Sequence, residues 1–126
     1  MLLRRIIFVI DDDLGMLRAI KRLLELSQFD IKTFTSAEAF LDSANACDAE
    51  CLVLDINLSG ISGIELRRKL ARTGLSVPTI FITGKDSEIV RKAALEVGYA
   101  AYLTKPFTAK QLTDAIGAAL TLSSVE

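Results

Sequence analysis

The chain has 126 residues, of which 51% are hydrophobic and 25% are charged, and this composition fits one compact globular domain with a buried core. Fifteen basic and sixteen acidic side chains leave a formal net charge of −1, which argues against direct binding of nucleic acid or of an anionic membrane. The apolar stretch behind the charged N-terminus covers only residues 6–10, too short for a signal peptide or a membrane span.

Two cysteines without a secretory leader indicate a cytoplasmic protein in a reducing compartment. Cys47 and Cys51 are spaced like a pair of metal ligands, but the chain has no histidine and no second cysteine pair to complete such a site. We therefore expect one thiol in a turn and one buried in a strand.

Short apolar runs and amphipathic helical patterns alternate along the chain. The expected strands cover residues 6–10, 31–34, 52–54, 79–82 and 100–103. The expected helices cover the region around 17–24, then 37–43 and 64–72, the segment from 87 to 98, and the segment from 109 to about 120. Ser36 and Ser87 are suited to begin helices, and Gly74 and Gly98 are suited to end them.

This alternation predicts a doubly wound α/β fold, because short connections between successive strands and helices give right-handed crossovers and a parallel sheet covered on both faces. The strands are apolar almost throughout, as expected for a sheet that is buried on both sides. The chain contains no repeat, low-complexity stretch or linker. Residues 1–126 are therefore expected to form a single domain.

Polar side chains follow four of the five expected strands. Asp11 and Asp12 follow the first, Asp55 follows the third, Thr83 follows the fourth, and Lys105 stands just after the fifth. The carboxyl ends of parallel strands meet at one edge of a sheet, where open α/β folds bind their ligands. Each acid alone would be explained by helix capping or by a solvated turn, but the five groups together predict a functional site.

Three carboxylates at one edge repel one another unless a cation offsets them, and oxygen ligands without His or Cys select Mg²⁺ rather than zinc. Asp55 stands alone at the end of a central strand, where an ionised carboxylate can attack phosphorus and form an acyl phosphate. Lys105 can then pair with a phosphoryl oxygen, and the Thr83 hydroxyl can donate to another. The pattern therefore indicates Mg²⁺-dependent phosphoryl transfer to Asp55.

The segments 10–13, 54–55, 81–84 and 102–107 resemble, in order and spacing, the motifs of the response-regulator receiver domain of two-component signalling. The resemblance extends from about residue 5 to residue 120 and implies a flavodoxin-like fold, with five parallel strands in the order 2-1-3-4-5 and five helices. It also implies that Asp55 is the phosphoacceptor and that the surface of the fourth helix, fifth strand and fifth helix changes on phosphorylation.

The resemblance assigns a role to each candidate residue. The implied Mg²⁺ ligands come from the acidic pair Asp11 and Asp12, from Asp55, and from the backbone carbonyl of Asn57. The remaining implied roles are phosphate sensing by Thr83 and Lys105, an aromatic switch at Tyr102, and a cis peptide bond between Lys105 and Pro106. An amphipathic ring at a strand edge would also account for Tyr102.

The loop after Asp55 departs from the family pattern. Receivers commonly have Met-Pro-Gly where this chain has Leu58-Ser59-Gly60, and serine lacks the fixed φ of proline, so a more mobile loop is expected. Asn57 and Lys85 flank the expected phosphoryl group. We predict that these two residues tune the access of water to the phosphoryl group. Identical dephosphorylation half-lives in wild type, Asn57→Ala and Lys85→Ala would contradict this prediction.

Having no histidine of its own, the chain is expected to take its phosphoryl group from a sensor histidine kinase or a phosphotransfer protein. Control of transcription is the favoured output, because the Phe-Ile-Thr-Gly run over residues 81–84 is similar to receivers that precede DNA-binding domains. The alternatives are a stand-alone receiver that acts by protein contact, a Mg²⁺-dependent aspartyl phosphohydrolase, and a pseudo-receiver. Dimerisation on phosphorylation through the alanine-rich last helix is a further expectation, although core packing also explains those alanines.

Overall fold

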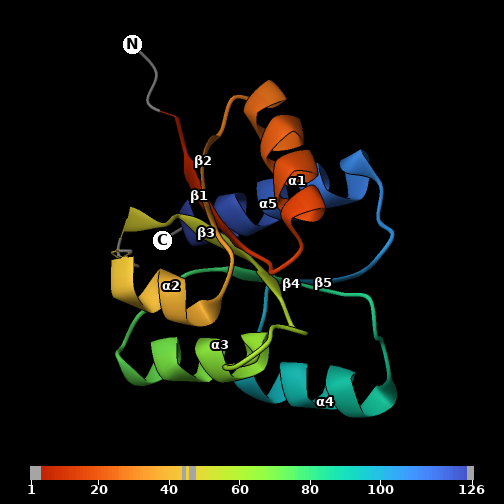
Figure 1. The fold of residues 1–126 in the computed structure, drawn as a ribbon. Helices are drawn as coiled ribbons and strands as arrows, with labels where there is room; N and C mark the ends of the chain where they lie inside the picture. The colour runs from red at the N-terminus through yellow and green to blue at the C-terminus, as the bar shows by residue number, and fades with distance from the viewer. Residues whose placement is uncertain (1–3, 44, 46–47, 125–126) are drawn as a thin grey trace.

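The computed structural model describes residues 4–43, 45 and 48–124, so Cys47 lies outside the described residues. Within these residues, strands and helices alternate from β1 to α5 (Figure 1). The strands are β1 (Ile6–Ile10), β2 (Asp30–Phe34), β3 (Cys51–Asp55), β4 (Thr79–Thr83) and β5 (Ala101–Thr104). The helices are α1 (Leu14–Leu26), α2 (Ala37–Ser43), α3 (Gly63–Arg72), α4 (Glu88–Val97) and α5 (Ala109–Ser124).

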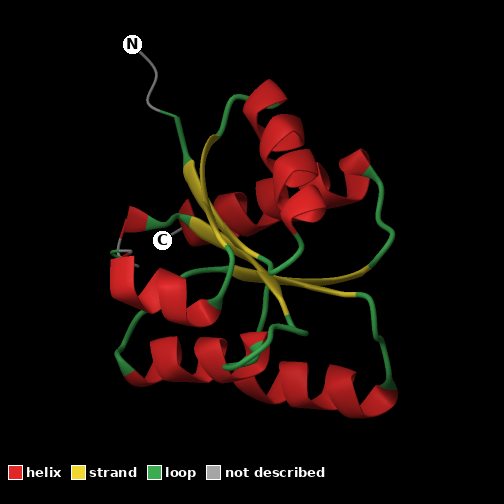
Figure 2. Cartoon of the chain, viewed as in Figure 1, coloured by secondary structure: helices red, strands yellow, loops and turns green. Residues whose placement is uncertain are grey.

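The sheet is parallel throughout, with the strand order β2-β1-β3-β4-β5, which confirms the predicted fold. Helices α1 and α5 cover one face, and α2, α3 and α4 cover the other (Figures 1 and 2). Successive side chains of a strand point to opposite faces, so Ile7 and Val9 enter one hydrophobic cluster while Phe8 and Ile10 enter the other. Burial on both faces explains the unbroken apolar runs of the central strands.

Ser36 and Ser87 precede α2 and α4, and Gly98 follows α4, as the sequence predicted. The side chains of Asp13, Ser36 and Ser87 each accept a hydrogen bond from a backbone N–H three residues further on, as helix N-caps do. Gly98 ends α4 with φ +82°, a conformation that favours glycine. The predicted strands and the three middle helices agree with the structure to within a residue at their ends, where β3 and β4 include Asp55 and Thr83 as their last residues. Helix α1 begins three residues before the predicted region, and α5 continues four residues beyond the predicted end.

Helix α4 and the edge strand β5 are less buried than the central strands of the sheet. On the predicted inward face of α4, Ala94 is fully buried, while Val90, Ala93 and Val97 are only partly buried against the same cluster. No residue of β5 is fully buried, because an edge strand has a neighbour on one side only. Within the described residues, no helix combines the length and the apolar character that a membrane crossing requires.

Candidate functional site

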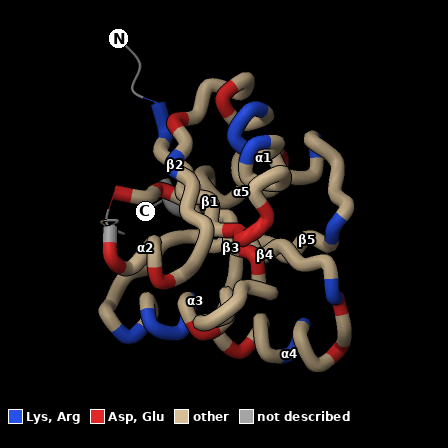
Figure 3. The backbone as a smooth tube through the Cα atoms, in the orientation of Figure 1, with Lys and Arg blue, Asp and Glu red and all other residues tan. Residues whose placement is uncertain are grey.

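Three carboxylates meet where β1 and β3 end. The two strands are parallel neighbours that pair Ile10 with Leu54, so the residues that follow, Asp11 and Asp55, lie side by side. Oxygen atoms of Asp11, Asp12 and Asp55 all lie within 4.8 Å of one another. Figure 3 shows acidic positions, in red, near the labels of β3 and β4. Asp11 and Asp55 are buried and Asp12 is exposed, so solvent reaches the cluster from one side.

Lys105 brings a positive charge to this cluster from the end of β5. Its Nζ atom donates to Oδ2 of Asp11 at 2.9 Å and to Oδ2 of Asp55 at 3.0 Å. The Lys105–Pro106 peptide bond is cis, in agreement with the expectation from the resemblance. One ammonium group faces three carboxylates, so the cluster keeps an excess of negative charge that a cation can offset.

Burial shapes the acid–base properties of this cluster. The pKa of Asp11 is raised from 3.8 to about 6, mainly by desolvation and in part by the charge of Asp55, against the lowering effects of hydrogen bonds from the Asp13 backbone and from Lys105. Burial by itself disfavours the charged form of Lys105, but its hydrogen bonds to the two carboxylates outweigh that effect and raise its pKa. The lysine therefore stays charged beside the acids near neutral pH.

The donor set fits a hard divalent cation such as Mg²⁺. The candidate ligands are carboxylate oxygens of Asp11, Asp12 and Asp55, and Mg²⁺ prefers oxygen ligands. The backbone N–H of Asn57 donates to Oδ1 of Asp55 at 2.9 Å, which fixes the start of the loop beside the acids. The Ser59 hydroxyl lies 3.2 Å from Oδ2 of Asp12, so the residue that replaces the usual proline contacts one of the candidate ligands.

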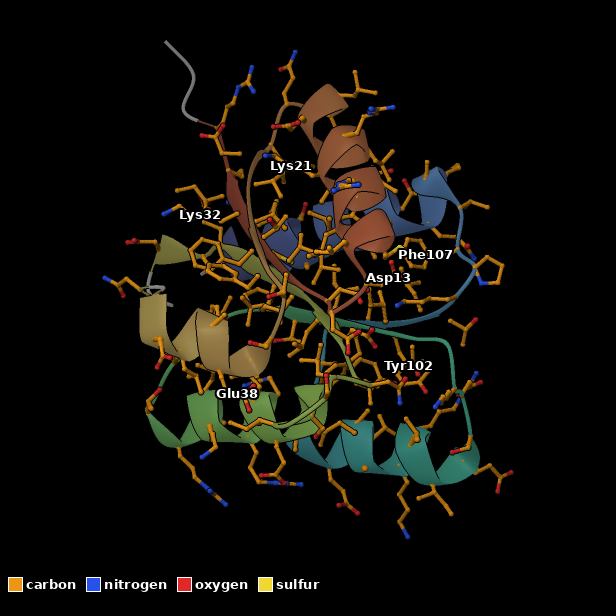
Figure 4. All side chains as sticks on the ribbon, viewed as in Figure 1. Asp13, Lys21, Lys32, Glu38, Tyr102 and Phe107 are labelled. Atoms are coloured by element: carbon orange, nitrogen blue, oxygen red, sulfur yellow. The ribbon has the colours of Figure 1, made fainter. Side chains whose placement is uncertain are left out.

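Two residues that the sequence analysis did not single out hold the loop after Asp55 in place. A Cβ atom at Gly63 would lie 2.2 Å from the backbone oxygen of Asp55, so only glycine lets α3 begin this close to the end of β3. Glu38, which lies between α2 and α3 in Figure 4, accepts a hydrogen bond from the backbone N–H of Ile61 at 3.0 Å. Nothing in the local sequence distinguishes Gly63 or Glu38 from an ordinary loop glycine or helix-end acid.

Thr83 is fully buried at the end of β4, next to β3. Its hydroxyl donates to Oδ1 of Asn57 at 2.6 Å and accepts from the backbone N–H of Lys85 at 3.0 Å. The structure thus brings Thr83 and Asn57 together at the edge that carries Asp55. The contact also gives the Asn57 side chain a partner that the sequence did not indicate.

Tyr102 lies on the α4 side of β5, at the edge of the sheet (Figure 4). Its hydroxyl donates to Oδ1 of Asp86 at 2.8 Å, and its ring contacts that of Tyr99 with centroids 5.8 Å apart. Desolvation and the hydrogen bond to Asp86 raise the pKa of Tyr102 to about 12, so the phenol stays protonated and remains a donor. In this conformation the Tyr102 hydroxyl is hydrogen-bonded to a residue of the loop between β4 and α4.

A search of known protein families agrees with this geometry. The model of the response regulator receiver domain matches residues 7–117. The chain belongs to the response regulator receiver domain family. Receiver domains are signalling modules of two-component systems rather than enzymes with an external substrate, and in general they use Mg²⁺ and a histidine kinase partner.

Relatives of this receiver domain include two named bacterial regulators. The response regulator protein TmoT of Ectopseudomonas mendocina is 36% identical over 118 residues, which are 94% of this chain and 54% of TmoT. The transcriptional regulatory protein TdiR of Thauera aromatica is 33% identical over 117 residues, which are 93% of this chain and 52% of TdiR. The receiver domain therefore corresponds to about half of either relative.

Among solved structures, the response regulator StyR superimposes on this receiver domain with a TM-score of 0.85 at 35% sequence identity. The superposition covers 95% of this chain and 61% of the StyR chain. This likeness extends the agreement from sequence to the arrangement of strands and helices.

Proposed function

We propose that the domain accepts a phosphoryl group on Asp55 from the phosphohistidine of a sensor histidine kinase or a phosphotransfer protein. The observation that carries this proposal is the contact between Lys105 Nζ and Oδ2 of Asp55 at 3.0 Å, within a cluster of acids at a strand end. The contact keeps a positive charge where a phosphoryl group attached to Asp55 would place its oxygens.

The transfer step conserves atoms and charge. A carboxylate oxygen of Asp55 attacks phosphorus and forms a new P–O bond, while the P–N bond of the donor breaks and its electron pair returns to the imidazole, which takes up a proton. Asp55 needs no general base because an ionised carboxylate is already a nucleophile. Lys105 is proposed to bind a phosphoryl oxygen after transfer, which its contact with Asp55 supports, and the Thr83 hydroxyl is proposed to bind another once it leaves Asn57.

Asp11, Asp12, Asp55 and the backbone carbonyl of Asn57 are the groups that would hold Mg²⁺. A bound Mg²⁺ would offset the charge of the nucleophile and of the phosphoryl group during the transfer. The excess of acids over the single lysine supports this assignment.

The test is the intact mass of the protein after incubation with acetyl phosphate, with Mg²⁺ and with EDTA. We expect wild type to gain one phosphoryl group with Mg²⁺ only, and Asp55→Ala to gain none. Asp13→Asn is a matched control, because Asp13 caps α1 and asparagine caps as well, so it should gain the group like wild type. Failure of folded wild type to gain a phosphoryl group would refute the proposal and favour a pseudo-receiver.

Phosphorylation is proposed to move Thr83 toward the phosphoryl group and to turn the Tyr102 ring inward, which changes the surface of α4, β5 and α5. The output that we propose is control of transcription in the cytoplasm by a longer regulator of which residues 1–126 are the receiver domain. The match to about half of the transcriptional regulator TdiR supports this output. Loss of reporter activation by Asp55→Ala in the full regulator would test it, and unchanged activation would contradict it.

Dimerisation on phosphorylation remains a prediction. Of the alanines in α5, Ala119 is buried and Ala115 packs against the hydrophobic cluster, so core packing accounts for these two, whereas Ala109 and Ala118 are exposed. Sedimentation of the protein before and after phosphorylation would measure any change in mass. An unchanged monomer would contradict the prediction and favour signalling by contact with another protein.

A further inference from the structure

Three side chains beside the edge strand β5 contact one another. They are Asp86, Arg91 and Tyr102, and we call them the tyrosine latch. Arg91 donates to both carboxylate oxygens of Asp86 at 2.8 Å. The Tyr102 hydroxyl donates to Oδ1 of the same carboxylate at 2.8 Å, and the Arg91 guanidinium lies 5.3 Å from the centroid of the Tyr102 ring. Each member therefore contacts both of the others.

The latch joins three parts of the fold. Tyr102 belongs to β5, Arg91 belongs to α4, and Asp86 lies in the loop between β4 and α4. A planar guanidinium forms a bidentate pair with a carboxylate and also packs on an aromatic face, so Arg91 fixes the carboxylate and the ring at once. The ring position shown here is thus stabilised by side chains outside the acidic cluster.

We infer that Asp86 and Arg91 are positioning residues that hold the Tyr102 ring in the partly buried position seen here and thereby oppose its inward turn in the unphosphorylated domain. This inference rests on the proposed function, because it specifies what opposes the proposed inward turn of the ring. An inward turn has to break the hydroxyl bond to Asp86 and the ring contact with Arg91. Contacts present in one state only shift the population toward that state.

The same loop connects the latch to the phosphorylation site. The backbone N–H of Lys85 donates to Oγ1 of Thr83, and Asp86 is the next residue. When the Thr83 hydroxyl leaves Asn57 for a phosphoryl oxygen, the loop loses this attachment, and Asp86 is free to move away from the Tyr102 hydroxyl. Phosphorylation and removal of the latch should therefore move the same ring in the same direction.

The test follows the Tyr102 ring by ¹⁹F NMR in protein labelled with 3-fluorotyrosine, with Tyr99→Phe used to assign the two signals. We compare unphosphorylated wild type, Arg91→Ala, Arg91→Lys and Lys92→Ala, and we take wild type with Mg²⁺ and acetyl phosphate as the other end point. Lys92→Ala is the matched control, since it removes one positive charge from another exposed position of α4.

We expect Arg91→Ala to move the Tyr102 signal toward that of the phosphorylated protein, with about a threefold rise in the ratio of rings turned inward to rings held by the latch. Arg91→Lys should give a smaller shift because it keeps the charge but loses the bidentate geometry. Lys92→Ala should coincide with wild type. If Arg91 had only a structural role, Arg91→Ala would not shift the Tyr102 signal from its position in unphosphorylated wild type toward its position in the phosphorylated protein.

Two outcomes separate this inference from the proposed function. If acetyl phosphate moves the Tyr102 signal but Arg91→Ala does not, the latch is overturned and the phosphoacceptor role stands. If no phosphoryl group is gained, the change of the fluorine shift between H₂O and D₂O still measures the exposure of the ring. In that case a less exposed Tyr102 ring in Arg91→Ala supports the latch, and an unchanged exposure overturns it.

Discussion

Replacement of Asp11 by asparagine is expected to stabilise the protein when no divalent cation is present. The pKa of the Asp11 carboxyl is raised, mainly by burial, from 3.8 to about 6. At neutral pH this shift corresponds to a free-energy cost of about 3 kcal/mol for keeping the carboxylate ionised in the folded state. Solvent enters beside the exposed Asp12 and screens part of this cost. We therefore expect Asp11→Asn to raise the free energy of unfolding by about 1–2 kcal/mol in EDTA.

The assay is urea unfolding of wild type and Asp11→Asn in EDTA at several pH values. Above about 6 the Asp11 carboxyl is ionised in the folded and unfolded states, so the full cost is present. As the pH falls from about 6 to 3.8, the folded state binds a proton that the unfolded state does not, and wild type regains stability. The difference between the two proteins should therefore be largest above pH 6 and should vanish below pH 3.8.

Mg²⁺ provides a second comparison. A cation that binds the folded state raises the free energy of unfolding by mass action, so wild type should gain more from added Mg²⁺ than Asp11→Asn, which has lost a candidate ligand. Asp13→Asn, the same change two residues away, should alter stability by less than about 0.5 kcal/mol. A variant that is less stable than wild type in EDTA at pH 7.5, or a difference that persists at low pH, would refute the reasoning.

Three further substitutions test the contacts around the site by urea unfolding. Gly63→Ala should lower the free energy of unfolding by about 3 kcal/mol or more, because its Cβ would meet the Asp55 backbone oxygen at 2.2 Å. Lys105→Met should lower it by about 1–3 kcal/mol in EDTA, since it leaves buried carboxylates without their cation. Thr83→Val should lower it by about 1–2 kcal/mol, because the buried hydroxyl that bonds Asn57 is lost.

Each of these substitutions has a matched control or a contradicting outcome. Gly117→Ala, in an exposed position of α5 with open space at the Cβ, should raise the free energy of unfolding by about 0.5–1 kcal/mol. Lys110→Met removes an exposed lysine and should leave stability nearly unchanged. A Thr83→Val protein as stable as wild type would contradict the assigned hydrogen bonds, and a stable Gly63→Ala would contradict the close approach of α3 to β3.

The secondary structure could be predicted from the sequence because its causes act within a few residues. Asp13, Ser36 and Ser87 cap backbone groups three positions away, and the apolar repeat of α1 at Leu17 and Ile20 follows from the helical period alone. The alternation of strands and helices then leaves few possible topologies. That topology brings the ends of the four strands that carry polar side chains to one edge of the sheet.

Contacts that depend on how distant segments pack could not be read from the sequence. Glu38 reaches Ile61 across 23 positions, and the close approach at Gly63 depends on how α3 is placed against β3. Arg91 closes the latch only because the register of β4 and β5 brings Tyr102 beside the loop that carries Asp86. Local patterns do not record such distances.

The sequence by itself determined the fold class, the edge of the sheet that carries the site, and the residue types that gather there. The tertiary structure alone decided that Lys105 touches both Asp11 and Asp55, that Thr83 bonds Asn57, and that burial raises the pKa of Asp11. The physical reason is range: periodicity and capping act along the chain, whereas hydrogen bonds and desolvation depend on atoms that only folding brings within a few ångströms.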